Sequence, residues 1–329
     1  MHATPIEERT VKIFIAGATG VVGRRLVPLL VSAGHDVVGM SRSAERAAEL
    51  ESAGARGVVG DILDPRRLRE LLTDVRPEII VHQVTDVPKA LDPGRTQEQF
   101  AANVLVRSVG TRNLVQAARD AGARRIVAQS YAHIYAPTGG WIKIESDELD
   151  AGDHVPEGRR RNVAAVIALE RAVLASPGIE GVALRYGALY GPGTAYDPAG
   201  GSIAGLVRRR HYPLVGGGTG WTSFVHVDDA AAAVMLALDG PAGVYNITDD
   251  RPAPASEWLP YYAALLGAPP PRHVPAFAVR ALGREHFAFR ATQQRAADNR
   301  KARSQLGFAP AYRTWRDGWS RELAVPVAA

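Results

Sequence analysis

Short, wholly apolar runs alternate with amphipathic segments over the first 186 residues of the chain. Runs that are apolar at every position are typical of strands buried on both faces, and apolar residues spaced by three or four are typical of helices. Strands are expected at 11–16, 36–40, a run ending near 61, 78–82, 124–130 and 181–186, and helices at 21–33, 44–52, 65–73, 97–121 and 163–175. This alternation predicts an α/β fold, a doubly wound parallel sheet of the Rossmann type.

The pattern becomes irregular after Tyr186, where Gly and Pro residues cluster. Further helices are expected at 202–210, at 225–238 with Asp228 capping its first turn, and from 256 to about 306, and a strand at 243–247. We therefore predict two units. Residues 10–186 and 224–248 would form a nucleotide-binding domain, and residues 187–223 and 249–329 a smaller, mixed C-terminal substrate domain.

Composition narrows the possible settings. The 329 residues include no cysteine, which excludes disulfides, thiolate metal ligands and a cysteine nucleophile, and is consistent with a cytoplasmic protein. The first ten residues are polar and no apolar run approaches about 18–20 residues, so neither a secretory signal nor a membrane span is expected. The net charge of +5 comes from arginines interleaved with acidic residues, which does not favour nucleic-acid binding. No His, Asp and Glu grouping has the spacing of metal ligands, so no metal is expected.

Three glycines directly follow the first predicted strand, in the run GATGVVG. Gly17 permits a tight turn, Gly20 lets backbone amides approach a pyrophosphate, and Gly23 lets the helix pack closely against the strand. The positive end of that helix then faces the phosphates. The sequence predicts a dinucleotide site here, with Thr19 and Val21 of the same turn also in contact with the cofactor.

The end of the second predicted strand bears on which nicotinamide cofactor is used. An acidic residue there would bind the adenosine ribose, but the chain has Ser41 and Arg42, whose hydroxyl and guanidinium suit a 2′-phosphate. NADP(H) is therefore favoured, with NAD(H) as the alternative. Asp61 and Ile62 follow the third strand and are expected at the adenine, while Asp64 before a proline is expected to cap the next helix.

These motifs resemble those of the extended short-chain dehydrogenase/reductase family, the NAD(P)-dependent epimerase/dehydratase group. The resemblance spans about residues 11–310 and rests on GATGVVG, GDILD, VGTRNLVQAA, IVAQSYAHIYAP, LRYGALYGPG, FVHVDDAA and GVYNITDD. It implies a YxxxK pair as the acid–base machinery, with a Ser or Thr after the fifth strand. The chain departs from this pattern, because Asn162 and Val166 stand at the Tyr and Lys positions and no Tyr precedes a Lys by four residues. Arg107 also replaces an expected Asn.

Three interpretations follow from this departure. Acid–base work could pass to Tyr131, His133 and Ser130, with the histidine titrating near neutrality and Arg160 or Arg161 favouring the phenolate. The reaction would then be that of an NADP(H)-dependent oxidoreductase or epimerase. Alternatively, the fold could support a non-redox isomerisation or cyclisation, or an NADP(H)-sensing binding protein. The neighbouring run at 159–161 is otherwise expected to be a solvated helix face.

The resemblance also implies that substrate lies between the two units. The matching residues are Tyr186, Tyr190 and Trp221, which offer flat apolar faces with polar tips. A small metabolite is expected, and a sugar-like carbonyl or alcohol is consistent with these faces. Family members often dimerise, so a homodimer is a further expectation.

Overall fold

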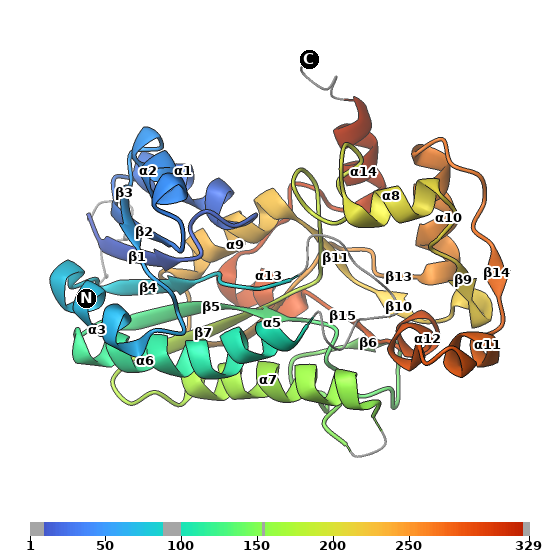
Figure 1. The fold of residues 1–329 in the computed structure, drawn as a ribbon, viewed down its shortest axis with the longest axis horizontal. Coiled ribbons are helices and arrows are strands. Elements are labelled where there is room, and N and C mark those ends of the chain that lie inside the picture. Colours follow the sequence, from blue (N-terminus) through green and yellow to red (C-terminus); the bar gives the residue numbers. More distant parts are fainter. Residues whose placement is uncertain (1–9, 88–99, 153–154, 325–329) are drawn as a thin grey trace.

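The computed structural model describes residues 10–87, 100–152 and 155–324 (Figure 1). Within them, one parallel sheet has the order β12-β7-β5-β4-β1-β2-β3. Its strands are β1 (Lys12–Ala16), β2 (Asp36–Ser41), β3 (Arg56–Val59), β4 (Ile79–His82), β5 (Arg125–Tyr131), β7 (Glu180–Tyr186) and β12 (Gly243–Ile247). The chain moves outward from β1 in one direction through β2 and β3, and then in the other direction from β4. This order confirms the predicted doubly wound Rossmann sheet.

Helices cover both faces of this sheet (Figure 1). One face carries α1 (Gly23–Ser32), α2 (Ala44–Ser52) and α9 (Val227–Ala237), and the other carries α3 (Pro65–Val75), α6 (Thr111–Asp120) and α7 (Glu157–Leu174). The side chains of β1 alternate between the two layers, with Ile13 and Ile15 on the α1 side and Phe14 on the α3 side. Such double-sided burial explains why the strands are apolar throughout.

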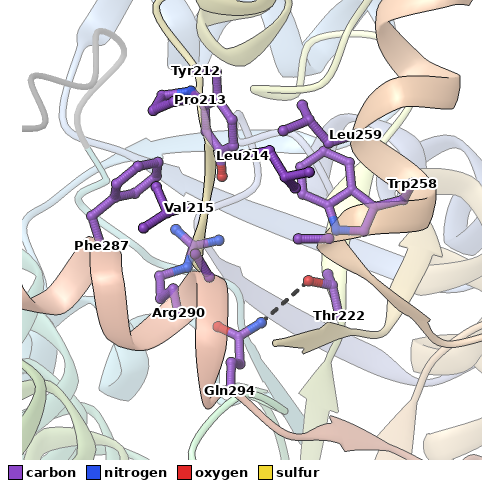
Figure 2. Close-up of a pocket in the computed structure, with 12 residues that line it drawn as sticks. Tyr212, Pro213, Leu214, Val215, Thr222, Trp258, Leu259, Phe287, Arg290 and Gln294 are labelled. Atoms are coloured by element: carbon purple, nitrogen blue, oxygen red, sulfur yellow. Dashed lines mark hydrogen bonds between the residues drawn. The ribbon is translucent and has the colours of Figure 1, made fainter. Parts of the chain in front are cut away.

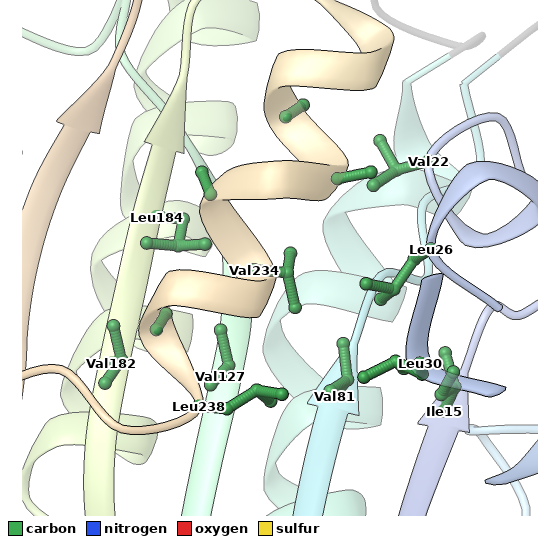
Figure 3. Packing of buried hydrophobic residues seen from close by; sticks show 14 of the residues in the cluster. Ile15, Val22, Leu26, Leu30, Val81, Val127, Val182, Leu184, Val234 and Leu238 are labelled. Carbon is green, nitrogen blue, oxygen red and sulfur yellow. The ribbon is translucent and has the colours of Figure 1, made fainter. Parts of the chain in front are cut away.

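The core between α9 and the sheet is densely packed (Figure 3). Val234 and Leu238 lie over Val127 and Leu184 of β5 and β7, and Leu26 of α1 completes the layer. These side chains are at most 2% exposed. Because burying each such side chain stabilises a fold by about 1.5–3 kcal/mol, this layer holds α1 and the turn before it firmly against the sheet.

Three predicted helices differ from those observed. The long helix begins, within the described residues, as α5 (Ala101–Leu105), widens into a π-helical turn at Val106–Gly110 and continues as α6; residues 97–99 lie outside the described part. Helix α7 begins at Glu157 rather than 163, because the polar run 157–161 hid its first turns. The predicted helix 225–238 opens with a strand, β11 (Phe224–His226), paired with β8 (Ala188–Tyr190).

The helix caps give one confirmation and one correction. The Asp64 carboxylate accepts a hydrogen bond from the Arg67 amide, so the predicted cap of α3 is confirmed. At α9 the cap is His226, whose Nδ1 accepts from the Asp228 amide. The prediction that Asp228 caps this helix was wrong, because the helix starts two residues later than its apolar pattern suggested.

The remaining elements form a smaller C-terminal lobe, defined here as α8 (Ser202–Arg208), α10 (Ala255–Leu265), α11 (Ala276–Ala281), α12 (Glu285–Thr292) and α14 (Trp315–Ala324) with their short strands (Figure 1). Its core is aromatic, built around Tyr196, Phe224, Trp258 and Trp319. Helix α13 (Arg300–Leu306) returns to the first core, where Ala302 and Leu306 are buried. In the described part of the chain, no helix is long and apolar enough to cross a membrane.

Candidate active site

The glycine-rich turn lies where the strand order reverses, between β1 and β4. Gly17 has φ +90°, and a Cβ there would come within 2.7 Å of the Gln83 carbonyl carbon. The Gly20 amide donates to the Gly17 carbonyl at 3.0 Å, and a Cβ on Gly23 would lie 2.3 Å from that same oxygen. A side chain is therefore excluded at Gly23 by the turn itself and at Gly17 by the backbone that follows β4.

No side chain caps the start of α1, where the Arg24 and Arg25 amides donate to the carbonyls of Gly20 and Val22. Its N-cap residue Val22 supplies no side-chain hydrogen bond to the first turn. The first amides of a helix need an acceptor, and an anion such as a pyrophosphate fills that role. Thr19 and Val21 lie partly buried in this turn, and the Thr19 hydroxyl is 3.5 Å from that of Ser41. The residues present thus fit a dinucleotide at this crevice.

The residues expected at the adenosine end have definite neighbours. Ser41 is buried, and its hydroxyl accepts from the Ser43 amide at 3.3 Å. Arg42 keeps 65% of its side chain exposed and forms an ion pair with Asp86 at 3.4 Å. The guanidinium is thus accessible to a 2′-phosphate, but a carboxylate already lies beside it.

The turn after β3 holds the other two predicted contacts. The Asp61 carboxylate accepts from the Leu63 amide at 2.9 Å, and Ile62 is buried against Gly110. Asp61 therefore orders the turn in which it lies. A contact of either residue with adenine stays a prediction.

Tyr131 ends β5 and is half-buried beside a buried arginine. The Arg107 guanidinium carbon lies 5.8 Å from the centre of the Tyr131 ring. Burial lowers the pKa of Arg107 to about 10, against the opposing influence of Tyr131, so Arg107 remains a cation at neutral pH. Its place on the π-helical turn brings it there, and π-helical turns often occur at functional sites.

The cations predicted on α7 have different surroundings. Arg161 is exposed and ion-paired with Glu157. Arg159, expected on a solvated face, is buried, pairs with Asp150, and donates to the carbonyls of His133 and Tyr135. That expectation was wrong, because α7 turns this side chain toward the loop that follows β5.

His133 does not have the near-neutral pKa expected of it, and its catalytic role stays a prediction that the geometry does not favour. It is 1% exposed, and its Nε2 accepts from the Ser223 amide at 3.1 Å. Burial, Arg290 and Arg159 lower its pKa to about 3. The ring is therefore neutral, carries its hydrogen on Nδ1, and joins β5 to the C-terminal lobe.

Ser130 belongs to a buried polar network. Its hydroxyl donates to the Glu170 carboxylate at 2.6 Å, and Arg185 donates to both oxygens of the same carboxylate at 2.8 and 2.7 Å. Arg185 also donates to the Tyr135 hydroxyl, which donates to Asn246. Because its one hydroxyl hydrogen is committed to Glu170, Ser130 is better described as a structural residue, and its catalytic role stays a prediction that the geometry does not favour.

Two of the three residues predicted to contact substrate lie in cores. Tyr186 is 1% exposed, with its hydroxyl 3.4 Å from Gln83 Nε2 and from the Ala230 carbonyl, and burial raises its pKa. Tyr190 is fully buried against His226 and Trp319. Their burial does not favour contact with substrate, and both contacts stay predictions. Trp221, partly buried on β10 (Trp221–Thr222), stays a prediction.

A cavity in the C-terminal lobe was missed by the sequence patterns (Figure 2). It encloses about 350 Å³, counting its open mouth. Its lining comes from the stretch 212–215, from Thr222, and from helices α10 and α12: Tyr212, Pro213, Leu214, Val215, Thr222, Ala255, Trp258, Leu259, Phe287, Arg290, Ala291 and Gln294. No local motif joins these segments, and within the stretch 285–292 Arg290 is the local feature that marks the cavity.

Arg290 links this cavity to Tyr131. Burial acts to lower the pKa of Arg290, but the oxygens of Tyr212, Tyr131 and Tyr196 outweigh it and raise the pKa. These three tyrosines therefore lie within electrostatic reach of one guanidinium. One comes from the end of β5 and two from the C-terminal lobe, so the candidate site spans both parts of the molecule.

Comparison with known proteins identifies relatives of this chain. A family model described as the NAD dependent epimerase/dehydratase family matches residues 13–248. A 3-diazoavenalumate denitrifying reductase from a Streptomyces species is 45% identical over 315 residues, covering 94% of this chain and 100% of that protein. A UDP-glucose 4-epimerase from Mycolicibacterium smegmatis is 28% identical, covering 91% and 93%.

Solved structures agree with the sequence comparisons. MoeE5 in complex with UDP-glucuronic acid and NAD is 25% identical, with a TM-score of 0.71 and coverage of 95% of this chain and 98% of that one. The UDP-glucose 4-epimerase of Thermotoga maritima, 20% identical with a TM-score of 0.72 and coverage of 95% and 97%, has the same fold. With its sheet order, its glycine turn and these relatives, the chain belongs to the NAD dependent epimerase/dehydratase family.

Proposed function

We propose that this protein is an NADP(H)-dependent reductase that removes the diazo group of a small metabolite. The observation that carries the proposal is its 45% identity, over the full length of the relative, to a reductase named for the denitrification of 3-diazoavenalumate. The site offers an independent reason. Asn162 and Val166 stand where the family resemblance implies the Tyr and Lys of a proton relay.

The chemistry of a diazo substrate explains why that relay is dispensable. Reduction of a carbonyl to an alcohol needs a hydride on carbon and a proton on oxygen. The Tyr and Lys supply that proton. When held at the glycine turn, the nicotinamide would supply a hydride. Transfer to an arenediazonium cation would form one C–H bond and break the C–N bond, with the electron pair leaving on N2, and no net proton would be consumed. Neither Asn162, which donates to the Gly158 carbonyl, nor the buried Val166 can titrate.

The cofactor-holding residues under this proposal are those of the glycine turn and its surroundings. The amides of the turn from Gly17 to Gly23 receive the pyrophosphate, and Arg42 receives the 2′-phosphate of NADP(H). The exposed guanidinium of Arg42 and the lack of an acid at residues 40–43 support NADP(H). The ion pair with Asp86 opposes it in part, because the carboxylate repels a phosphate.

Tyr131 remains the polar group of the Rossmann part that we place against the substrate. Arg107 next to it stabilises negative charge on a nearby oxygen, whether on the tyrosine or on a hydroxyl of the substrate. In this proposal the pair orients the substrate and no proton transfer to carbon is required of it. Ser130 and His133 are left as supporting residues, because both are held in buried hydrogen bonds.

The test uses a diazotised 3-amino-4-hydroxycinnamate with NADPH deuterated at the nicotinamide C4. The expected products are N2 and 4-hydroxycinnamate carrying one deuterium, detected by mass spectrometry, with matching loss of NADPH absorbance. Gly17→Ala serves as the control, because its Cβ would disturb the turn that holds the cofactor. Cofactor binding without consumption of NADPH, or a product free of label, contradicts the proposal. Either result would favour a non-redox enzyme or a nucleotide-sensing protein.

Tyr131→Phe separates diazo reduction from the carbonyl reduction or epimerisation common among relatives. If Tyr131 is the general acid for a carbonyl, removing its hydroxyl should lower kcat by about 100-fold or more. If it only orients a diazo substrate, loss of one hydrogen bond should lower kcat/KM by about 10-fold or less. The two outcomes do not overlap, and thermal unfolding of the variant checks that the fold is retained.

A further inference from the structure

We infer that the cavity between α10 and α12 is a subsite for a single carboxylate of the substrate, with Arg290 as the group that binds it. The inference rests on the proposed function, since it names the part of a small acidic metabolite held away from the reacting carbon. Figure 2 shows the Arg290 side chain reaching from α12 toward the Tyr212 hydroxyl, between Phe287 and Trp258.

The first argument is that polar atoms lining the cavity are buried without partners. In the described part of the chain, Arg290 Nε, Trp258 Nε1 and Gln294 Oε1 make no hydrogen bond. Trp258 is 2% exposed and Gln294 is 1% exposed, so bulk water does not satisfy these atoms. A buried polar group without a partner costs about 1–3 kcal/mol. Arg290 Nε and Trp258 Nε1 are donors, so a carboxylate would supply the acceptors they lack, whereas Gln294 Oε1 is an acceptor and would need a donor.

The second argument is charge. Arg290 is a cation, and within the described residues no ion pair joins it to an acidic side chain, whereas the buried arginines at 159 and 185 are each paired with a carboxylate. The guanidinium lies within electrostatic reach of the hydroxyls of Tyr212, Tyr131 and Tyr196, the last of which hydrogen-bonds to it. Arg159, which is paired with Asp150, and the uncharged His133 and His286 are also within reach. A guanidinium enclosed by neutral donors and aromatic rings attracts an anion, and its planar fork matches the two oxygens of a carboxylate.

The third argument is size and wall chemistry, which select a flat monoanion. The Tyr212 ring lies edge-on to Phe287, with centres 5.3 Å apart, and 6.0 Å from the Trp258 ring. The walls of the cavity are mostly apolar and the room between them is narrow, which admits a flat group better than a bulky one. Arg290 is the one cation among its lining residues, so a single negative charge is matched, whereas the diphosphate of a sugar nucleotide would be left with uncompensated charge.

The position relative to Tyr131 makes the subsite part of the same site. Arg290 lies within electrostatic reach of Tyr131 and of Arg159, and the Arg159 guanidinium carbon lies 4.3 Å from the ring centre of Phe289, the residue before Arg290. A flat acid could therefore place its carboxylate at Arg290 and its far end near the tyrosine that ends β5. Arg290 would be a specificity-determining residue and not a group that takes part in bond breaking.

The experiment measures binding without turnover, so it is independent of the diazo proposal. Isothermal titration calorimetry at pH 7.5 with NADP⁺ present compares 4-hydroxycinnamate with its neutral amide, which has the same shape and no charge. The acid should bind at least about 10-fold more tightly than the amide, as expected for a charge-assisted contact. Arg290→Gln should abolish this preference, and Arg209→Gln, which removes an exposed arginine of the same lobe, should keep it.

Several results would overturn the inference. Equal affinity for acid and amide in the unaltered protein, no binding of the acid at millimolar concentration, or a preference that survives Arg290→Gln would each do so. The first two results need no variant, so the inference stays testable even if Arg290→Gln misfolds. Titration with UDP is the counter-test, because tight Arg290-dependent binding of UDP with none of the acid would assign the cavity to a nucleotide diphosphate. Loss of diazo turnover with the acid preference intact would refute the proposed function alone.

Discussion

Replacing Ser130 by Ala tests whether this residue is part of the chemistry or of the scaffold. Its hydroxyl donates to Glu170 at 2.6 Å inside a network that is fully enclosed, with Ser130 1% exposed and Glu170 5% exposed. The substitution removes one of three hydrogen bonds to the carboxylate and leaves the two from Arg185. We therefore expect loss of stability with little loss of turnover.

The size of the effect follows from these contacts. A hydrogen bond to a charged group contributes about 1.5–3 kcal/mol, and Ser130→Ala should lie at the lower end because Arg185 still neutralises Glu170. Glu170→Gln removes the charge itself and leaves Arg185 buried without its counter-ion, which should cost about 3–5 kcal/mol. For 329 residues the unfolding entropy is about 0.7 kcal/mol/K, so the expected falls in Tm are about 2 °C and about 4–7 °C.

The assay pairs thermal unfolding with steady-state kinetics on the same samples. If Ser130 is structural, Ser130→Ala should keep kcat within about threefold of the unaltered protein and show the small fall in Tm. Glu170→Gln should show the larger fall in Tm. The opposite pattern, with kcat down about 100-fold and Tm unchanged, would refute the reasoning, because that is the signature of a group that acts on the substrate.

Three further predictions concern the cofactor and pH. Gly17→Ala should abolish NADPH binding in a fluorescence titration, because its Cβ would lie 2.7 Å from the backbone of Gln83, whereas Gly122→Ala, with φ +76° and nothing within 4 Å, should lose only about 1 kcal/mol of stability. Arg42→Ala should raise the Kd for NADPH about 10-fold with little change for NADH, and an equal effect on both would argue against a 2′-phosphate contact. His133 has a pKa of about 3 in the fold and about 6.5 when unfolded, so the unfolded chain binds the extra proton. Stability should then be highest above pH 6.5 and fall toward pH 3, and His133→Gln should flatten this slope in urea denaturation; an unchanged slope would mean that the histidine is not neutral in the fold.

The local sequence pattern predicted most of the structure of the nucleotide-binding half. The glycine spacing predicted the turn because its constraints act between residues a few positions apart, as the contact of Gly23 with Gly17 shows. The Asp64 cap was equally local. The apolar runs predicted the strands because a sheet covered on both faces leaves no polar position.

What tertiary structure alone decided is the content of the candidate site. The sequence predicted Tyr190 and Tyr186 as substrate-contacting residues, but both lie in cores. It predicted Arg159 as solvated, but this side chain is buried. Burial depends on segments that are distant in the chain. The pKa of His133 is set by its enclosure and by Arg290, which is 157 positions away in the sequence. The sequence by itself determined the fold and the cofactor turn, whose signals repeat over a few residues. The cavity around Arg290 exists only once the stretch 212–215, α10 and α12 have been brought together by packing, so its chemistry belongs to the folded protein and not to any single stretch of the chain.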